Sequence, residues 1–78
     1  MSISNFAFAP AELTIARGDT VIWANADFVP HSATGRNGRW DSGSIAGAAS
    51  WRFVADSAGR YEYYCVLHPS MTGTIVAR

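Results

Sequence analysis

The stretch GRYEYYCVLHPSM, residues 59–71, joins a strand pattern to a cluster of soft donor atoms. Its side chains alternate, so Tyr61, Tyr63 and Cys65 share one face of a strand. Glu62 lies on the opposite face and marks that face as the solvent side. We therefore expect Cys65 to point inward at the end of a core strand. The only cysteine of the chain, one of its two histidines and its only internal methionine all lie in or just after this strand.

Similar alternation recurs along the chain and predicts further strands. The predicted strands lie at residues 12–16, 20–25, 50–54, 60–65 and 73–77, with one β-prone run from residue 3 to Pro10 and shorter candidates near 32–34 and 40–41. Residues 17–19 are predicted to form a hairpin turn. We find no amphipathic helix, internal repeat or linker. Short strands at this spacing predict an all-β, Greek-key β-sandwich of about seven to eight strands.

The 78 residues are enough for one domain, residues 1–78, and too few for two separate cores. Hydrophobic residues make up 49% of the chain and charged residues 15%, which indicates a folded unit rather than a disordered one. Small domains often need a disulfide or a metal to be stable. Because a single cysteine excludes an internal disulfide, a bound metal is the stabilising element to look for.

Charge and hydropathy exclude several classes of partner. Six basic residues balance six acidic ones without a basic run, so no nucleic-acid partner is expected. No apolar run approaches the roughly 20 residues of a membrane span. The first ten residues also lack the charged and apolar regions of a signal peptide.

The candidate metal ligands are two imidazoles, one thiol and one thioether. His68 and Met71 follow Cys65 at +3 and +6 in what is predicted to be a loop, and His31 lies in the loop after strand 20–25. A Greek-key sandwich can bring these two loops to the same end. The resulting donor set suits copper in both oxidation states, with two His and one Cys in a trigonal plane and Met as a long axial ligand.

Each of these residues also has an ordinary explanation. A lone buried cysteine is usually a small apolar filler, and methionine usually fills core space. A nucleophilic Cys–His pair is a further alternative, but the sequence shows neither an orienting carboxylate nor an oxyanion hole for it. We therefore do not expect an enzyme.

Two longer stretches resemble the cupredoxins, the blue-copper family. They are FAFAPAELTIARGDTVIWANADFVPHS, residues 6–32, and GRYEYYCVLHPSMTGTIVAR, residues 59–78. The first resembles the N-x-x-x-x-P-H context of the plastocyanin, amicyanin and pseudoazurin branch, with Asn25 before Pro30 and His31. The second resembles the C-x-x-H-x-x-M spacing of amicyanin.

The resemblance implies a type 1 copper electron-transfer protein that binds one copper ion. It implies that His31 is the buried ligand, that one edge of His68 reaches the surface, and that Cys65 and Met71 complete the ligand set. Asn25 is expected to tie the His31 loop to the Cys65 loop. Redox proteins are the implied partners, docking on an apolar patch around His68, and the protein is expected to be a periplasmic or otherwise extracytoplasmic monomer.

Two departures from the family pattern lead to further expectations. The segment between the matching stretches is short, so a minimal cupredoxin is predicted. Relatives with such short ligand loops usually carry Pro where this chain has Leu67, and the N–H of Leu67 is expected to donate a hydrogen bond to the Cys65 sulfur. Copper storage or delivery, or a role as a domain of a larger copper oxidase, are the alternative functions.

Overall fold

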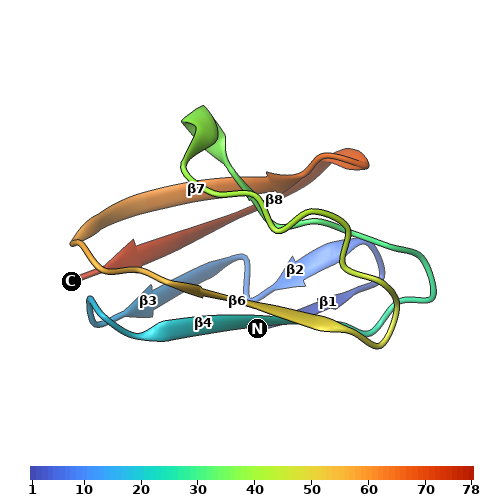
Figure 1. Ribbon diagram of the computed structural model, residues 1–78, viewed down its shortest axis with the longest axis horizontal. Helices are drawn as coiled ribbons and strands as arrows, with labels where there is room; N and C mark the ends of the chain where they lie inside the picture. Colours follow the sequence, from blue (N-terminus) through green and yellow to red (C-terminus); the bar gives the residue numbers. More distant parts are fainter.

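The computed structural model describes all 78 residues as two four-stranded β-sheets that face each other (Figure 1). The first sheet has the order β2–β1–β4–β6, and its strands are β1 (Ser2–Ser4), β2 (Ala7–Ala9), β4 (Thr20–Asn25) and β6 (Ser50–Val54). The second has the order β3–β8–β7–β5, with β3 (Glu12–Ile15), β5 (Thr34–Gly35), β7 (Gly59–Cys65) and β8 (His68–Ala77). The 3-10 helix η1 (Arg36–Gly38) is the only helical element. The predicted all-β sandwich is confirmed.

Alternation located the long strands well. β4 and β6 have the predicted bounds, and along β4 the side chains are alternately exposed and buried. In β7 the predicted inward residues Tyr61, Tyr63 and Cys65 are all buried, whereas Glu62 is exposed. Period-two patterns succeed here because one face of each strand packs against the opposite sheet.

Two local predictions were wrong, and a third, the β-prone run, was confirmed as β structure but was incomplete. Residues 17–19 do not form a hairpin turn, because β3 pairs with β8 and β4 pairs with β6, so the turn carries the chain from one sheet to the other. The β-prone run before Pro10 is itself a hairpin of β1 and β2, with its turn at Asn5 and Phe6. The predicted loop after Cys65 is instead a tight turn followed at once by β8, in which Cys65 pairs with His68.

Pro69 lies inside β8, a position that proline usually avoids. The pairing of β8 with β3 begins only at Thr74, so Pro69 precedes the part of β8 that has a strand on both sides. A missing N–H is tolerated at such an edge position. The sequence signal for a loop was therefore misleading.

The interior is dominated by six ring-bearing side chains, which we call the aromatic core: Phe8, Trp23, Trp40, Phe53, Tyr61 and Tyr63. Trp40 and Phe53 stack with ring centroids 4.3 Å apart. Gly35 and Gly73 make room for two of the rings, since a Cβ at either position would collide with Trp40 or Tyr63 respectively. Phe53 and the neighbouring Trp51 are only partly buried, and Trp51 packs against this cluster.

Three connections lie together at one end of the sandwich, on the right in Figure 1. They are the β1–β2 turn, the loop after β4 and the β7–β8 turn, and we call them the metal end. Hydrogen bonds join the loop after β4 to each of the other two. No helix in the structure combines the length and the apolar character needed to cross a membrane.

Candidate metal centre

Three predicted ligands converge at the metal end. The Nδ1 atoms of His31 and His68 lie 3.8 Å and 3.7 Å from Cys65 Sγ, and one donor atom from each residue lies within 4.8 Å of the other two. His31 and Cys65 are fully buried, whereas His68 is partly exposed. This difference in burial between the two histidines is the one expected from the sequence.

Backbone pairing fixes each of the three residues. Cys65 ends β7 and His68 begins β8, and the two stand opposite each other in the ladder. His31 lies in the loop after β4 and exchanges two backbone hydrogen bonds with Ile45, at 3.1 Å and 2.7 Å. The donor atoms are therefore held by main-chain contacts and not only by their side chains.

The two sulfur–nitrogen spacings suit donors that share one metal ion. Bonds of about 2.3 Å to thiolate sulfur and about 2.0 Å to imidazole nitrogen, which are values typical of zinc, place these atoms about 3.7 Å apart at 120° and about 3.5 Å apart at a tetrahedral angle. The S–N distances of 3.7 Å and 3.8 Å lie close to these values, so both nitrogens are placed to share a metal ion with the sulfur. Two imidazoles and one thiolate in a plane are the ligands of a blue-copper site.

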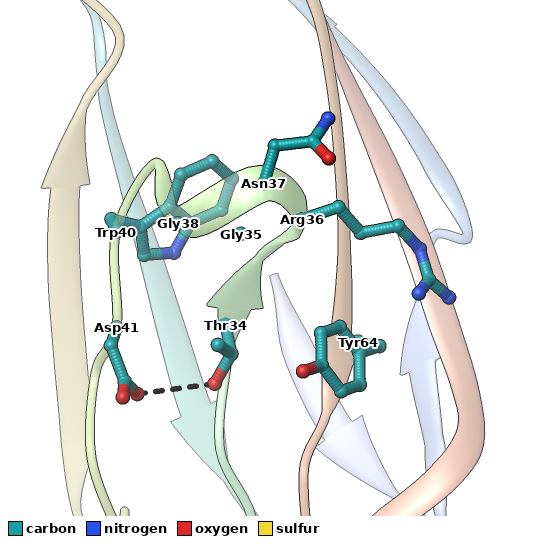
Figure 2. Close-up of a pocket in the computed structure, with 8 residues that line it drawn as sticks. All are labelled: Thr34, Gly35, Arg36, Asn37, Gly38, Trp40, Asp41 and Tyr64. Carbon is teal, nitrogen blue, oxygen red and sulfur yellow. Dashed lines mark hydrogen bonds between the residues drawn. The ribbon is translucent and has the colours of Figure 1, made fainter.

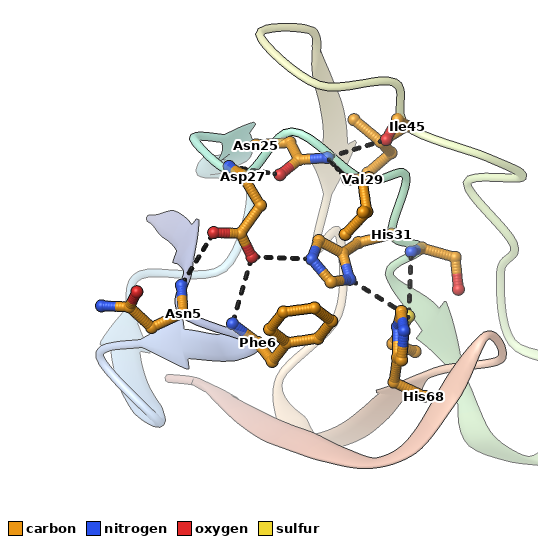
Figure 3. Close-up of polar contacts among 10 residues, drawn as sticks. Asn5, Phe6, Asn25, Asp27, Val29, His31, Ile45 and His68 are labelled. Carbon is orange, nitrogen blue, oxygen red and sulfur yellow. Dashed lines mark hydrogen bonds and ion pairs between the residues drawn. The ribbon is translucent and has the colours of Figure 1, made fainter.

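Asp27 is a site residue that the sequence analysis missed. Its Oδ2 lies 2.8 Å from His31 Nε2, and its carboxylate also accepts the backbone N–H groups of Phe6 and Asn5 (Figure 3). These contacts lower the pKa of Asp27, first through the Phe6 N–H and then through the His31 side chain. Because an ionised carboxylate only accepts hydrogen bonds, Nε2 of His31 carries the proton and Nδ1 is free to bind a metal. An i, i+4 Asp–His spacing was the only signal for this contact in the sequence.

Ser32 links the two ligand-bearing segments. Its backbone N–H donates to Cys65 Sγ at 3.3 Å, and its Oγ accepts the N–H of Val66 at 2.9 Å. The expected hydrogen bond from the Leu67 N–H to the sulfur is absent, and Ser32 supplies the backbone donor instead. Leu67 lies in the tight β7–β8 turn and is half exposed.

Asn25 is buried and makes three side-chain hydrogen bonds. None of them joins it to the Cys65 segment, contrary to the expectation from the resemblance. Its Nδ2 donates to the carbonyl oxygens of Val29 and Ile45 at 3.0 Å and 2.9 Å, and its Oδ1 accepts the N–H of Asp27 at 3.0 Å. The side chain is occupied within its own loop and with the segment around Ile45. Ser32, which lies next to His31, makes the link to Cys65 instead.

Met71 is buried at 4% exposure and follows His68 on β8. It belongs to the same buried cluster as Cys65. Its predicted role as an axial ligand stays a prediction.

A profile of the copper binding proteins of the plastocyanin/azurin family matches residues 1–78. The chain belongs to this family. The chain is 32% identical to plastocyanin of Scenedesmus fuscus, over 91% of this chain and 86% of that protein. It is 27% identical to amicyanin of Paracoccus versutus over 97% of this chain, but it spans only 61% of that relative.

Solved amicyanin structures have the same fold. The reduced Cu(I) form of an amicyanin variant superposes with a TM-score of 0.94 at 26% identity, covering 99% of this chain and 78% of that one. Amicyanin of Paracoccus versutus gives a TM-score of 0.88 at 27% identity, with 99% and 77% coverage. These matches confirm the predicted cupredoxin fold, and membership of the copper-binding family confirms the predicted metal, copper.

The surroundings of the site differ in polarity. Apolar side chains are exposed near the three donors, including Phe6 at 51%, Phe28 at 103% and Leu67 at 50%. A polar, open pocket lies along β5 and η1, where the Arg36 guanidinium stacks over Tyr64 (Figure 2). None of the three donor residues lines this pocket.

Proposed function

We propose that this protein is a type 1 copper electron carrier, in which His31, Cys65, His68 and Met71 would hold the copper ion. The observation that supports this most directly is the pair of S–N distances, 3.7 Å and 3.8 Å, in a chain of a copper-binding family. Bound copper supplies the one-electron Cu(I)/Cu(II) couple.

The chain's own contribution is to hold the donors still. His31 is fixed by its backbone pairing with Ile45, and Cys65 is fixed by its ladder pairing with His68 and by the Ser32 N–H. Because these contacts are made within the protein itself, the fold sets the positions of the donor residues. The donor atoms should therefore move little when the copper gains or loses an electron. The burial of Cys65 also keeps water away from its sulfur.

Electrons would enter and leave through His68, the partly exposed ligand. Exposed apolar side chains of Phe28, Val29 and Leu67 are suited to a transient contact with a redox protein, since exposed apolar groups gathered at one place often mark interaction sites. We propose that the protein acts as a monomer in an extracytoplasmic compartment, as the resemblance implies.

A thiol, an imidazole and a carboxylate in series also resemble a nucleophilic catalytic triad. Asp27 orients His31, and His31 faces Cys65. However, Cys65 is 0% exposed and lines neither pocket of the protein, so no substrate reaches its sulfur. Burial therefore favours the electron carrier.

Optical and EPR spectra of the copper-loaded protein test the proposal. We expect one copper per chain and an intense blue absorption that disappears on reduction and returns on oxidation. Cys65→Ser should remove the blue band, because that band requires the thiolate. A colourless wild-type protein that exchanges Cu(I) rapidly would instead support copper delivery.

A further inference from the structure

A phenylalanine ring from the β1–β2 turn lies against both histidines. The Phe6 ring centroid is 5.3 Å from that of His31 and 4.9 Å from that of His68, with interplanar angles of 88° and 87° (Figure 3). Such edge-to-face contacts are favourable and directional. Phe6 thus contacts the buried ligand ring and the surface ligand ring together, although its own side chain is 51% exposed.

The backbone of this turn is strained at Phe6. Asn5 and Phe6 have φ values of 52° and 59°, both in the left-handed region. A two-residue hairpin turn of this type favours Asn followed by Gly. Asn5 suits the first position, but a bulky side chain at the second is unfavourable because its Cβ crowds the backbone. Strain of this kind is often retained where a side chain has a function.

One carboxylate holds both this turn and a ligand. Asp27 Oδ1 accepts the Asn5 N–H at 2.8 Å, while Oδ2 accepts the Phe6 N–H at 3.1 Å and the His31 Nε2–H at 2.8 Å. Asp27 is anchored in turn through its own N–H, which donates to the buried Asn25 side chain. The position of Phe6 is therefore coupled to the orientation of His31.

We propose that Asp27 and Phe6 are a coupled pair of positioning residues for the two histidine ligands. Asp27 keeps the proton of His31 on Nε2 and holds the strained turn, and this turn keeps Phe6 packed against both rings. The pair keeps both Nδ1 atoms directed at Cys65 before metal binds. This inference rests on the proposed function, because it assigns the pair to the same metal site.

Phe6→Gly separates positioning from stability. The substitution removes the ring and also relieves the left-handed backbone, so we expect the thermal unfolding midpoint of the metal-free protein to change little. The rate of copper dissociation should rise about tenfold, as for other groups that orient ligands. Asn37→Gly is the control, because it relieves a left-handed residue in η1 without removing any ring near the histidines.

Asp27→Asn tests the other half of the pair. Its single amide oxygen must serve three N–H donors, so nitrogen NMR of the metal-free variant should show His31 as a mixture of tautomers, whereas the wild type shows the proton on Nε2 alone. We expect the copper dissociation constant to rise about tenfold. Asp19→Asn is the control, since it removes a carboxylate from the turn between β3 and β4, which is not part of the metal end.

The double variant measures the coupling. If Asp27 acts partly through Phe6, the two substitutions together should weaken copper binding by less than the product of their separate effects. The proposal is overturned if the wild type binds blue copper while both single variants keep its dissociation rate and the His31 tautomer. A wild type that takes up no copper overturns the proposed function instead, and the tautomer measurement on the metal-free protein still tests Asp27.

Discussion

The aromatic core and the metal end are parts of the same sandwich, but they differ in how completely their buried polar atoms are paired. In the aromatic core the hydroxyl groups of Tyr61 and Tyr63 each donate a hydrogen bond, whereas the indole N–H groups of Trp23 and Trp40 are buried without a partner. At the metal end the buried side chains of Asn25, His31 and Ser32 all make hydrogen bonds. The core is thus specified mainly by volume and burial, whereas the metal end is specified by directed contacts.

This difference indicates how each region responds to substitution. Loss of volume in the core lowers the free energy of unfolding whether or not metal is bound. Loss of one hydrogen bond at the metal end has a smaller effect on folding, but it displaces a donor atom and should lower the affinity for copper. The following predictions test this contrast, beginning with the largest expected effect.

Trp23→Ala should destabilise the protein most. Trp23 is fully buried between the sheets and packs against Tyr63 with ring centroids 5.3 Å apart. Removal of such a side chain costs about 3–5 kcal/mol. Denaturant unfolding of the metal-free protein measures it, with the exposed neighbour Ile22→Ala as the control. A loss no larger than that of the control would show that the core is not the main source of stability.

Asn25→Ala should affect folding less and copper binding more. It leaves two carbonyl oxygens and the Asp27 N–H without their partner, but only the contact to the Ile45 oxygen is fully buried, so we expect a loss of about 1–3 kcal/mol in all. Because Asp27 also orients His31, we expect a weaker copper affinity in a competition titration with a chelator. An unchanged affinity together with lower stability would contradict the distinction between the two regions.

Ser32→Ala should weaken the link between the His31 and Cys65 segments. The hydroxyl accepts the Val66 N–H and is paired with Thr34, and its loss costs about 1 kcal/mol. Faster copper dissociation is the expected accompanying effect. Ser42→Ala is matched to it, because Ser42 also accepts a backbone N–H, that of Ala33, but has no contact with the Cys65 turn. Equal dissociation rates in the two variants would contradict this prediction.

Tyr63→Phe should have the smallest effect at neutral pH. Burial raises the pKa of Tyr63 above its ordinary value of 10.0. The folded state therefore releases this proton later than the unfolded state, so stability is full below pH 10.0 and falls as the pH rises toward the folded pKa. Unfolding measured on both sides of this pH should show a steeper alkaline loss in the wild type than in the variant. If the unfolding free energies of the wild type and the variant fall in parallel with pH, the raised pKa of Tyr63 is contradicted.

The contrast also explains which features the sequence could reveal. Burial alternates along a strand, so β4, β6 and the inward face of Cys65 were predictable. The donors His31 and His68 were found because their residue types are rare and chemically specific. Asp27 was missed since its contacts to Asn5 and Phe6 join positions 22 and 21 residues apart, and nothing in the local pattern encodes them.

The turns were also hard to predict, because their structure depends on contacts with distant parts of the chain. Residues 17–19 correctly indicated a change of direction, but which sheet the next strand joins depends on β8, which lies far along the chain. Phe6 resembled a strand residue because aromatic side chains favour strands. In the structure Phe6 has a left-handed backbone, and its N–H donates to the Asp27 carboxylate, a contact that the local sequence does not indicate.

The separation of the ligands along the chain also sets an order of events during folding. Cys65 and His68 become neighbours as soon as their hairpin forms, whereas His31 is 34 residues from Cys65 and joins them only when distant segments have docked. A folding chain can offer copper two donors early but all three only at the end. Copper taken up by the complete set then favours the folded state by mass action, so uptake of the ion reports that assembly has finished.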